Sequence, residues 1–174
     1  QVLSRNTVTI PAGTLVFSSA SGYDSYKWTA CSSGTESSCN VTTSATSNTL
    51  TRAFSQIGLK GVKLEKTIGV DTQPCYFAFS VIPYITTSSA TSCSILLRKN
   101  GSGGTNKWFK NDTEIAGVTS DTYTATENGT YTLKVTIGAD EFASAAFEVS
   151  TIIGGISVST QALASQTICE NEIA

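Results

Sequence analysis

Histidine is absent from the 174 residues of the sequence, and its absence excludes several kinds of chemistry. Nucleophilic sites of the Ser-His and Cys-His types need an imidazole as their general base, so this chain can build neither type. Zinc sites usually combine histidine with closely spaced cysteines, and the sequence also has no CxxC pair. We therefore expect no zinc site.

Carboxylate pairs are the remaining route to acid–base catalysis, as in glycoside hydrolysis. The candidate pairs are Asp112 with Glu114 and Asp140 with Glu141. Both fall in predicted surface turns, where acidic residues favour turn formation without any catalytic role. The sequence therefore predicts that the protein is not an enzyme.

Charged residues are scarce, at 14% of the chain against roughly 25% in an average soluble protein. The formal net charge is −2 and the pI about 5.1, so no basic field attracts nucleic acid or an anionic membrane. The longest apolar run, Tyr76 to Ile85, is too short to span a bilayer and contains Pro83. We predict neither nucleic-acid binding nor membrane insertion.

Methionine is also missing, even as an initiator, and no segment resembles a signal peptide. We interpret the chain as a processed or excised piece of a longer product. The residues that flank it in its precursor would show whether it belongs to an array of repeats.

Serine and threonine are abundant instead, making up 51 of the 174 residues. Threonine suits pleated strands, and serine suits turns and loops. Short alternating apolar segments recur at roughly ten-residue spacing with turns between them, which indicates β-sandwiches. We predict an all-β chain with two tandem sandwich domains, at residues 1–84 and 85–151. Residues 152–174 would be a connecting strand, a tail or the start of a further repeat.

The expected strands follow from period-two apolar patterns. In the first domain they lie at residues 8–10, 14–18, 23–28, 50–54, 59–68 and 76–82, with a polar loop at 30–48. In the second they lie at residues 94–98, 106–110, 121–125, 131–137 and 142–150, and residues 152–159 offer one more.

Five cysteines without metal-ligand spacing indicate disulfides in an oxidising compartment. Cys31 and Cys39 bracket a polar loop that a bridge between them would close, and Cys75 and Cys93 flank the junction of the two domains. Cys169 is left over. The sequence alone leaves the connectivity open.

The second domain resembles the Ig-like repeats of large bacterial surface and secreted proteins, including adhesins of gliding bacteria. The resemblance covers residues 107–136 well, where Trp108 takes the place of the core tryptophan and Tyr131 that of the tyrosine corner. Further matches to the pattern are Lys110, Asn111, Asp112, Ile115, Gly117, Thr122, Tyr123, Gly129, Thr130, Leu133 and Val135. The resemblance implies an Ig-like β-sandwich and says little about function.

The first domain resembles the polycystic-kidney-disease (PKD) type of sandwich repeat. Residues 26–28, centred on the core marker Trp28, stand for its aromatic strand, and residues 51–58 with 62–64 stand for the segment leading into a later strand. The acidic loop that usually follows the tryptophan is replaced by the Cys31–Cys39 loop.

The resemblance also bears on the other cysteines. In such arrays a cysteine often opens each repeat and another lies in the late hairpin, so Cys93 and Cys169 occupy opening positions. The late hairpin of the second domain carries Asp140 and Glu141 instead. This departure favours Cys75 as the partner of Cys93 by proximity.

Two kinds of surface site are further candidates. Extracellular arrays often hold calcium at module junctions, and the loop acids near module ends are Asp71, Asp140 and Glu141. Glycosylation sequons in predicted turns occur at Asn40, Asn100, Asn111 and Asn128. Solvated turn acids and unused sequons are the simpler interpretations.

The expected role is a noncatalytic extracellular stalk or adhesive module of a large bacterial surface protein, with neighbouring repeats or a surface glycan or protein ligand as partners. One alternative is a filament subunit in which residues 152–159 add a strand to a neighbouring copy. Another is a carbohydrate-binding module that uses Tyr23, Tyr26 or Phe109. The pairing of residues 152–159 and a glycan array would distinguish them.

Overall fold

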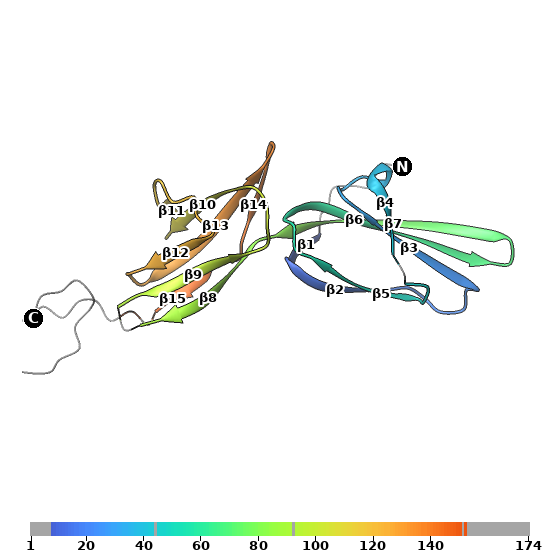
Figure 1. The fold of residues 1–174 in the computed structure, drawn as a ribbon, viewed down its shortest axis with the longest axis horizontal. Helices are drawn as coiled ribbons and strands as arrows, with labels where there is room; N and C mark the ends of the chain where they lie inside the picture. The colour runs from blue at the N-terminus through green and yellow to red at the C-terminus, as the bar shows by residue number, and fades with distance from the viewer. Residues whose placement is uncertain (1–7, 44, 92, 151, 153–174) are drawn as a thin grey trace, which may run out of the picture.

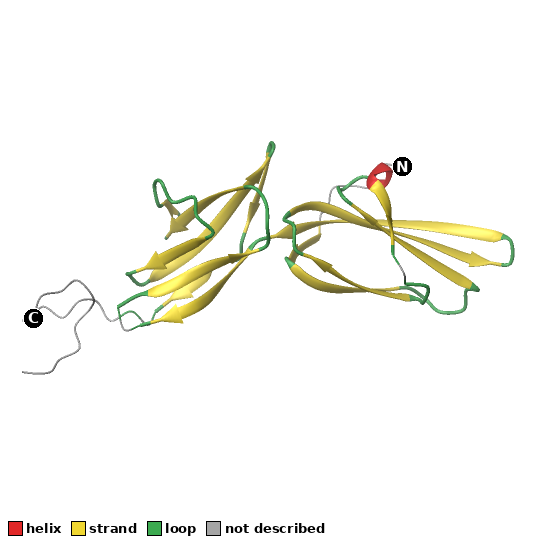
Figure 2. Cartoon of the chain, viewed as in Figure 1, coloured by secondary structure: helices red, strands yellow, loops and turns green. Residues whose placement is uncertain are grey.

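The computed structural model describes residues 8–43, 45–91, 93–150 and 152 (Figure 1). It is an all-β chain folded into two sandwich-like bodies that lie end to end along the long axis, as Figure 1 shows. Within the described residues the only helical segment is one 3-10 turn, η1 (Glu36–Ser38), which is red in Figure 2.

The first body pairs a five-stranded sheet with a two-stranded one. The larger sheet has the order β1-β7-β6-β3-β4 and the smaller one is β2-β5. The strands are β1 (Val8–Pro11), β2 (Gly13–Ser18), β3 (Ser25–Cys31), β4 (Cys39–Thr42), β5 (Thr49–Phe54), β6 (Gly58–Ile68) and β7 (Asp71–Ile82). β1 runs parallel to β7, and every other pairing in this body is antiparallel.

Alternating side chains build the core of the first body. On β6, Val62 and Leu64 are buried, while Lys63 between them reaches Glu36 and Glu65 on the outer face. The inner face packs against the two-stranded sheet in one apolar cluster. Its buried members are Ala12, Trp28, Leu50, Phe54, Val62, Leu64, Phe79 and Val81.

The second body has a three-stranded sheet, β12-β9-β8, opposite a sheet built around β13. One edge of β13 pairs with β10, which pairs in turn with β11, and its other edge pairs with β14 and then β15. The strands are β8 (Tyr84–Ala90), β9 (Ile95–Asn100), β10 (Thr105–Lys110), β11 (Thr113–Glu114), β12 (Thr122–Ala125), β13 (Gly129–Ile137), β14 (Asp140–Ala143) and β15 (Phe147–Val149). Trp108, Leu97 and Leu133 are fully buried between the sheets.

The two bodies repeat one arrangement around their tryptophans. Trp28 lies opposite Leu64 in the ladder as Trp108 lies opposite Leu133. Each indole Nε1 donates a hydrogen bond of 2.9 Å to a serine carbonyl, that of Ser47 in the first body and of Ser120 in the second. Each of these serines lies two residues before a strand of the smaller sheet, β5 or β12. Equivalent positions can therefore be compared between the bodies.

Three strands lie outside the predicted segments. β4 falls in the expected loop at 30–48, and β8 and β11 were not predicted at all. Threonine and serine make up much of β8, and β4 and β11 are only four and two residues long, so none of the three shows an extended apolar alternation. Pairing with neighbouring strands makes these segments strands. The expected last strand at 142–150 is interrupted at Ser144, whose Oγ accepts the Leu133 N–H at 3.0 Å. The expected strand at 152–159 lies outside the described residues except for Ile152.

Candidate functional site

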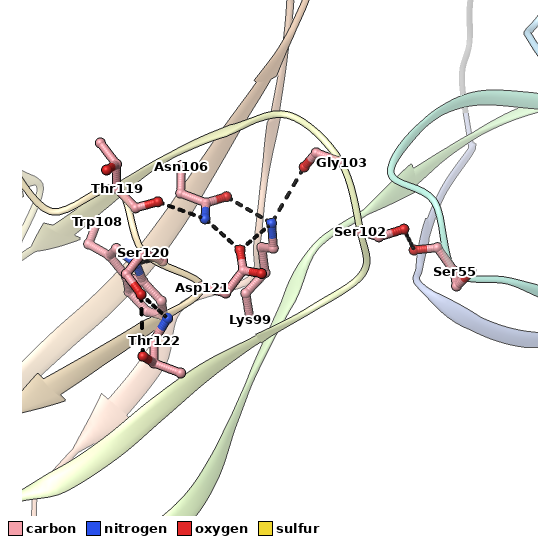
Figure 3. Close-up of polar contacts among 10 residues, drawn as sticks. All are labelled: Ser55, Lys99, Ser102, Gly103, Asn106, Trp108, Thr119, Ser120, Asp121 and Thr122. Carbon is pink, nitrogen blue, oxygen red and sulfur yellow. Dashed lines mark hydrogen bonds and ion pairs between the residues drawn. The ribbon is translucent and has the colours of Figure 1, made fainter.

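A charged side chain lies inside the second body, which makes this region the first candidate for a functional site. The side chain of Lys99 is only 4% exposed, yet it extends from β9 into the end of the sandwich (Figure 3). Its Nζ lies 2.7 Å from Oδ1 of Asp121, donates to Oδ1 of Asn106 at 3.0 Å and to the Gly103 carbonyl at 3.4 Å. The ammonium is therefore surrounded by oxygen acceptors.

Asn106 completes this cluster from the facing strand, β10. It is 3% exposed, and its Nδ2 donates to Oδ1 of Asp121 at 2.8 Å and to the Thr119 carbonyl at 3.2 Å. The backbone N–H of Lys99 donates to the Asp121 carbonyl at 2.8 Å, which ties the segment before β12 to β9. Lys99, Asn106 and Asp121 thus contact one another pairwise.

The electrostatics of the cluster follow from these contacts. The Lys99 and Asn106 hydrogen bonds lower the pKa of the Asp121 carboxyl from its ordinary value of 3.8, although partial burial opposes them. The Asp121 side chain is 69% exposed, so its Oδ1 contacts the cluster while much of the carboxylate contacts solvent. Removing an ammonium from water is costly unless acceptors replace the water, and here they do.

The first body has no such cluster at the equivalent positions. The Ser19 N–H donates to the Asn48 carbonyl, just as the Lys99 N–H donates to the Asp121 carbonyl. Tyr26 lies two residues before Trp28, as Asn106 lies two residues before Trp108. Serine, tyrosine and asparagine therefore stand where the second body has lysine, asparagine and aspartate.

No motif in the sequence predicted this cluster, although a local signal was present. On β9 the buried residues alternate as Ile95, Leu97 and Lys99, so the period-two pattern places the lysine at a core position. On β10 the same alternation places Asn106 beside Trp108.

The junction between the bodies is a second notable region. β7 ends at Ile82 and β8 begins at Tyr84, so buried Pro83 is the whole connection. Ile57, which precedes β6 of the first body, is 3% exposed and belongs to the apolar cluster of the second body. Conversely, Tyr84 packs against the cluster of the first body. Each body thus contributes apolar side chains to the other.

Backbone hydrogen bonds reinforce this junction. The Ile57 N–H donates to the Ser102 carbonyl at 3.0 Å, and the Ser102 N–H donates to the Ser55 carbonyl at 2.7 Å. The Ser102 hydroxyl also donates to the Ser55 carbonyl, at 3.4 Å (Figure 3). Gly101 has φ +96°, and a Cβ there would lie 2.8 Å from Cγ1 of Ile57. The contact therefore requires glycine, both for its backbone conformation and for space.

The structure shows the expected Cys31–Cys39 disulfide, which joins β3 to β4. The expected Cys75–Cys93 disulfide is wrong: Cys75 is a free, exposed thiol, and Cys93 forms a disulfide with another partner. β7 continues past Cys75 for seven residues at roughly 3.3 Å each before the junction, and β8 extends beyond it. The two cysteines are therefore too far apart for the short Cα–Cα distance of a disulfide.

The core markers lie inside the sandwiches. Trp28 and Trp108 are both buried, and the Tyr131 hydroxyl donates to the Glu127 carbonyl at 2.8 Å, the geometry of a tyrosine corner. Burial raises the pKa of Tyr131.

The three proposed calcium ligands do not form one site. Asp71 begins β7 in the first body, whereas Asp140 and Glu141 begin β14 in the second, where Glu141 pairs with Lys134 at 2.9 Å. Across the described part of the chain, no group of three or more Asp, Glu or Cys residues is placed to hold a metal ion.

Three of the four sequon asparagines use their side chains in the fold. Asn128 makes two hydrogen bonds of 2.9 Å with the backbone of Ile152, Asn100 donates to Thr86, and Asn111 accepts from the Thr130 N–H. Asn40 is exposed on β4. Glycan attachment at Asn128 or Asn100 would place a bulky sugar on an amide nitrogen that now donates a hydrogen bond within the fold.

The candidate sugar-binding aromatics are partly covered by lysines. Lys66 Nζ lies 4.4 Å from the ring centroid of Tyr23, and Lys134 Nζ lies 5.0 Å from that of Phe109. The hydroxyl of Tyr26 donates to the Ala20 carbonyl at 3.0 Å. The rings therefore do not present one open stacking surface.

The acidic turn residues of the second body also have structural roles. Glu114 pairs with Lys107 at 3.1 Å, and Asp112 lies in a tight turn with φ +63°.

Comparisons with known proteins add no relative. No protein-family model matches the chain, and no curated protein has a significantly similar sequence. Among the described residues, no helix has the length and apolar character needed to cross a membrane.

Proposed function

We propose that this chain is a noncatalytic extracellular stalk or adhesive segment of a large bacterial surface protein, built from Ig-like and PKD-like modules. The observation that carries the proposal is the junction, where Ile57 of the first body is buried in the second and one proline connects them. Flexibly linked binding domains need no such contact. A spacer that holds an extended shape needs a buried contact between its modules, because such a contact restricts their relative motion.

The strand arrangement of the second body supports the Ig-like assignment. The two facing sheets, the buried Trp108 and the Tyr131 hydrogen bond to a carbonyl four residues upstream are the features of such repeats. In the first body, the parallel pairing of β1 with β7 and the buried Trp28 support a related module.

The free end of the first body supports stacking with a further module. Residues 67–71 and 136–140 read TIGVD and TIGAD in equivalent hairpins. Ile137 of the second hairpin lies at the junction, where a Cβ on Gly58 would be 3.7 Å from its Cδ1. Its counterpart Ile68 is exposed, and neighbouring Val70 is 98% exposed at the hairpin tip. A preceding module would cover Ile68 as the first body covers Ile137.

Small-angle scattering of the full chain tests the stalk proposal. The wild type should scatter as one extended particle of fixed shape, and Ile57→Asp should produce a broader distribution of distances because a carboxylate replaces the buried contact. Leu59→Asp is the matched control on a more exposed position two residues away. A wild-type chain that scatters as two independently moving bodies would contradict a rigid stalk.

The same samples distinguish the other roles. Particle growth with concentration would favour a filament subunit. Signals on a glycan array that disappear in Tyr23 or Phe109 variants would favour a carbohydrate-binding module. A further test deletes this segment from the whole precursor and measures surface attachment. If attachment is lost but is restored by an unrelated spacer of equal length, the stalk role is supported.

A further inference from the structure

We propose that Lys99 and Asn106 join in an intramolecular isopeptide bond, with Asp121 as the proton carrier. The proposal rests on a buried amine and a buried carboxamide that face each other, with one carboxylate in contact with both (Figure 3). These groups are the complete set of reactants for a transamidation. No cofactor, metal or oxidant is required.

The amine lies within reach of the amide carbon. Nζ of Lys99 is 3.0 Å from Oδ1 of Asn106. Because the C=O bond is about 1.2 Å long, Cγ lies no farther than about 4.2 Å from Nζ. Productive attack begins at about 3–3.5 Å, so a small adjustment of two side chains brings the atoms together.

The carboxylate is placed to move protons between the two nitrogens. Oδ1 of Asp121 is 2.7 Å from Nζ, the attacking nitrogen, and 2.8 Å from Nδ2 of Asn106, the leaving nitrogen. The hydrogen bonds that lower its pKa keep it ionised before the reaction, so it can accept a proton from the ammonium. The neutral amine that results is the nucleophile.

The reaction balances within the cluster. The Nζ lone pair forms a bond to Cγ of Asn106 and the C=O π electrons move to Oδ1. The C=O bond then re-forms as the Cγ–Nδ2 bond breaks. Two protons of the original ammonium pass by way of Asp121 to Nδ2, which leaves as an ammonium ion. The product is a secondary amide between the two side chains, and the carboxylate of Asp121 is regenerated.

The internal repeat shows that this cluster is not needed to build the fold. At the equivalent positions the first body has Ser19, Tyr26 and Asn48, which can form no such bond. A buried lysine contributes little to stability compared with an apolar residue of similar size, because its desolvation offsets its interactions. A buried lysine and a buried asparagine that both contact one partly exposed carboxylate therefore favour a chemical role.

The bond would strengthen the junction. The covalent ring would enclose residues 100–105, and these include Gly101 and Ser102, which contact Ile57 and Ser55 of the first body. The cross-link would fix the loop on which the neighbouring body rests.

Peptide mass spectrometry of the folded full chain tests the proposal. Without the bond, trypsin cuts after Lys99 and Lys107 and releases peptide 100–107 at its full mass. With the bond, the acylated Lys99 resists cleavage, and peptide 99–107 appears lighter by one ammonia. Wild-type protein that yields only peptide 100–107 at full mass would overturn the proposal.

Other losses of ammonia are distinguishable by position. Cyclisation of Gln1 changes only the N-terminal peptide. A succinimide at Asn100 and Gly101 lightens peptide 100–107 but leaves the cut after Lys99 intact. A light peptide that begins at Asn100 therefore counts against the isopeptide bond.

Variants test each assigned role. Lys99→Arg should abolish the cross-link, Asn106→Asp should change the lost molecule from ammonia to water, and Asp121→Asn should reduce the cross-linked fraction at least tenfold. Lys107→Arg, which alters an exposed neighbour, should retain it. Fluorescence of the two buried tryptophans, Trp28 in the first body and Trp108 in the second, verifies that each variant folds. A folded Asp121→Asn chain that is cross-linked to the wild-type extent would refute the proton-carrier role.

Discussion

Replacing Ile57 with alanine removes the apolar contact on which the junction depends. The substitution deletes three carbons from a side chain that is 3% exposed. At roughly 0.8 kcal/mol for each buried carbon the transfer loss is about 2.4 kcal/mol, and an unfilled cavity raises the total to as much as about 5 kcal/mol. This is a large fraction of the stability of a small sandwich.

The place where this loss appears is as informative as its size. Ile57 belongs to the first body in sequence, but it packs in the cluster of the second. Calorimetry of the full chain should therefore show one coupled transition in the wild type. In Ile57→Ala the second body should unfold in a separate transition. Its midpoint should lie about 10–20 °C below that of the wild type, which corresponds to a loss of about 2.4 kcal/mol in a body of this size.

A matched substitution separates the junction effect from a general loss of apolar volume. Leu59→Ala deletes the same number of carbons two residues away, where the side chain is 38% exposed, and should cost less than about 1 kcal/mol. Equal effects of the two substitutions would refute the assignment of Ile57 to the core of the second body. The same assignment would be refuted if Ile57→Ala destabilised only the first body.

Four further variants test the interactions within each body. Tyr131→Phe should destabilise the second body by about 1 kcal/mol in urea, because the hydrogen bond to the Glu127 carbonyl is lost. Tyr76→Phe should be neutral or stabilising, because the buried Tyr76 hydroxyl has no hydrogen-bond partner among the described residues. A larger loss in Tyr76→Phe than in Tyr131→Phe would contradict these hydrogen-bond assignments. Serine at both Cys31 and Cys39 should lower the stability of the first body by about 2 kcal/mol in urea, and an unchanged midpoint would refute this. In the chain without the proposed cross-link, hydrogen bonds from Lys99 and Asn106 lower the pKa of Asp121 from 3.8, so its stabilisation is present above that pH and is lost as the pH falls through the lower folded value. Asp121→Asn should flatten this acid-side decline of the second body in circular dichroism melts, and equal declines in both proteins would contradict it.

Sequence patterns predict this fold where apolar residues alternate. Residues 59–68 and 131–137 show their period directly, and both are strands with one buried face. The short strands β4, β8 and β11 carry no such pattern, because cross-strand hydrogen bonds from the rest of the sheet make them strands. Local sequence contains no information about those partners.

The buried cluster illustrates a different limit. The alternation on β9 is enough to place Lys99 in the core, but the positions of Asn106 and Asp121 depend on how the two sheets face each other. The predicted Cys75–Cys93 disulfide is wrong for a related reason, because closeness along the chain does not imply closeness in space. β7 and β8 continue in line, so Cys75 and Cys93 lie far apart on either side of Pro83.

Pro83 also has a consequence for any longer assembly. A single buried residue with a fixed φ angle connects the bodies, so covalent geometry helps to set the rotation of one body about the long axis relative to the next. A row of modules joined in this way would turn by the same angle at each junction. Loops at equivalent positions would then follow a helical path of constant pitch, and ligands bound to them would be spaced at regular intervals around the rod.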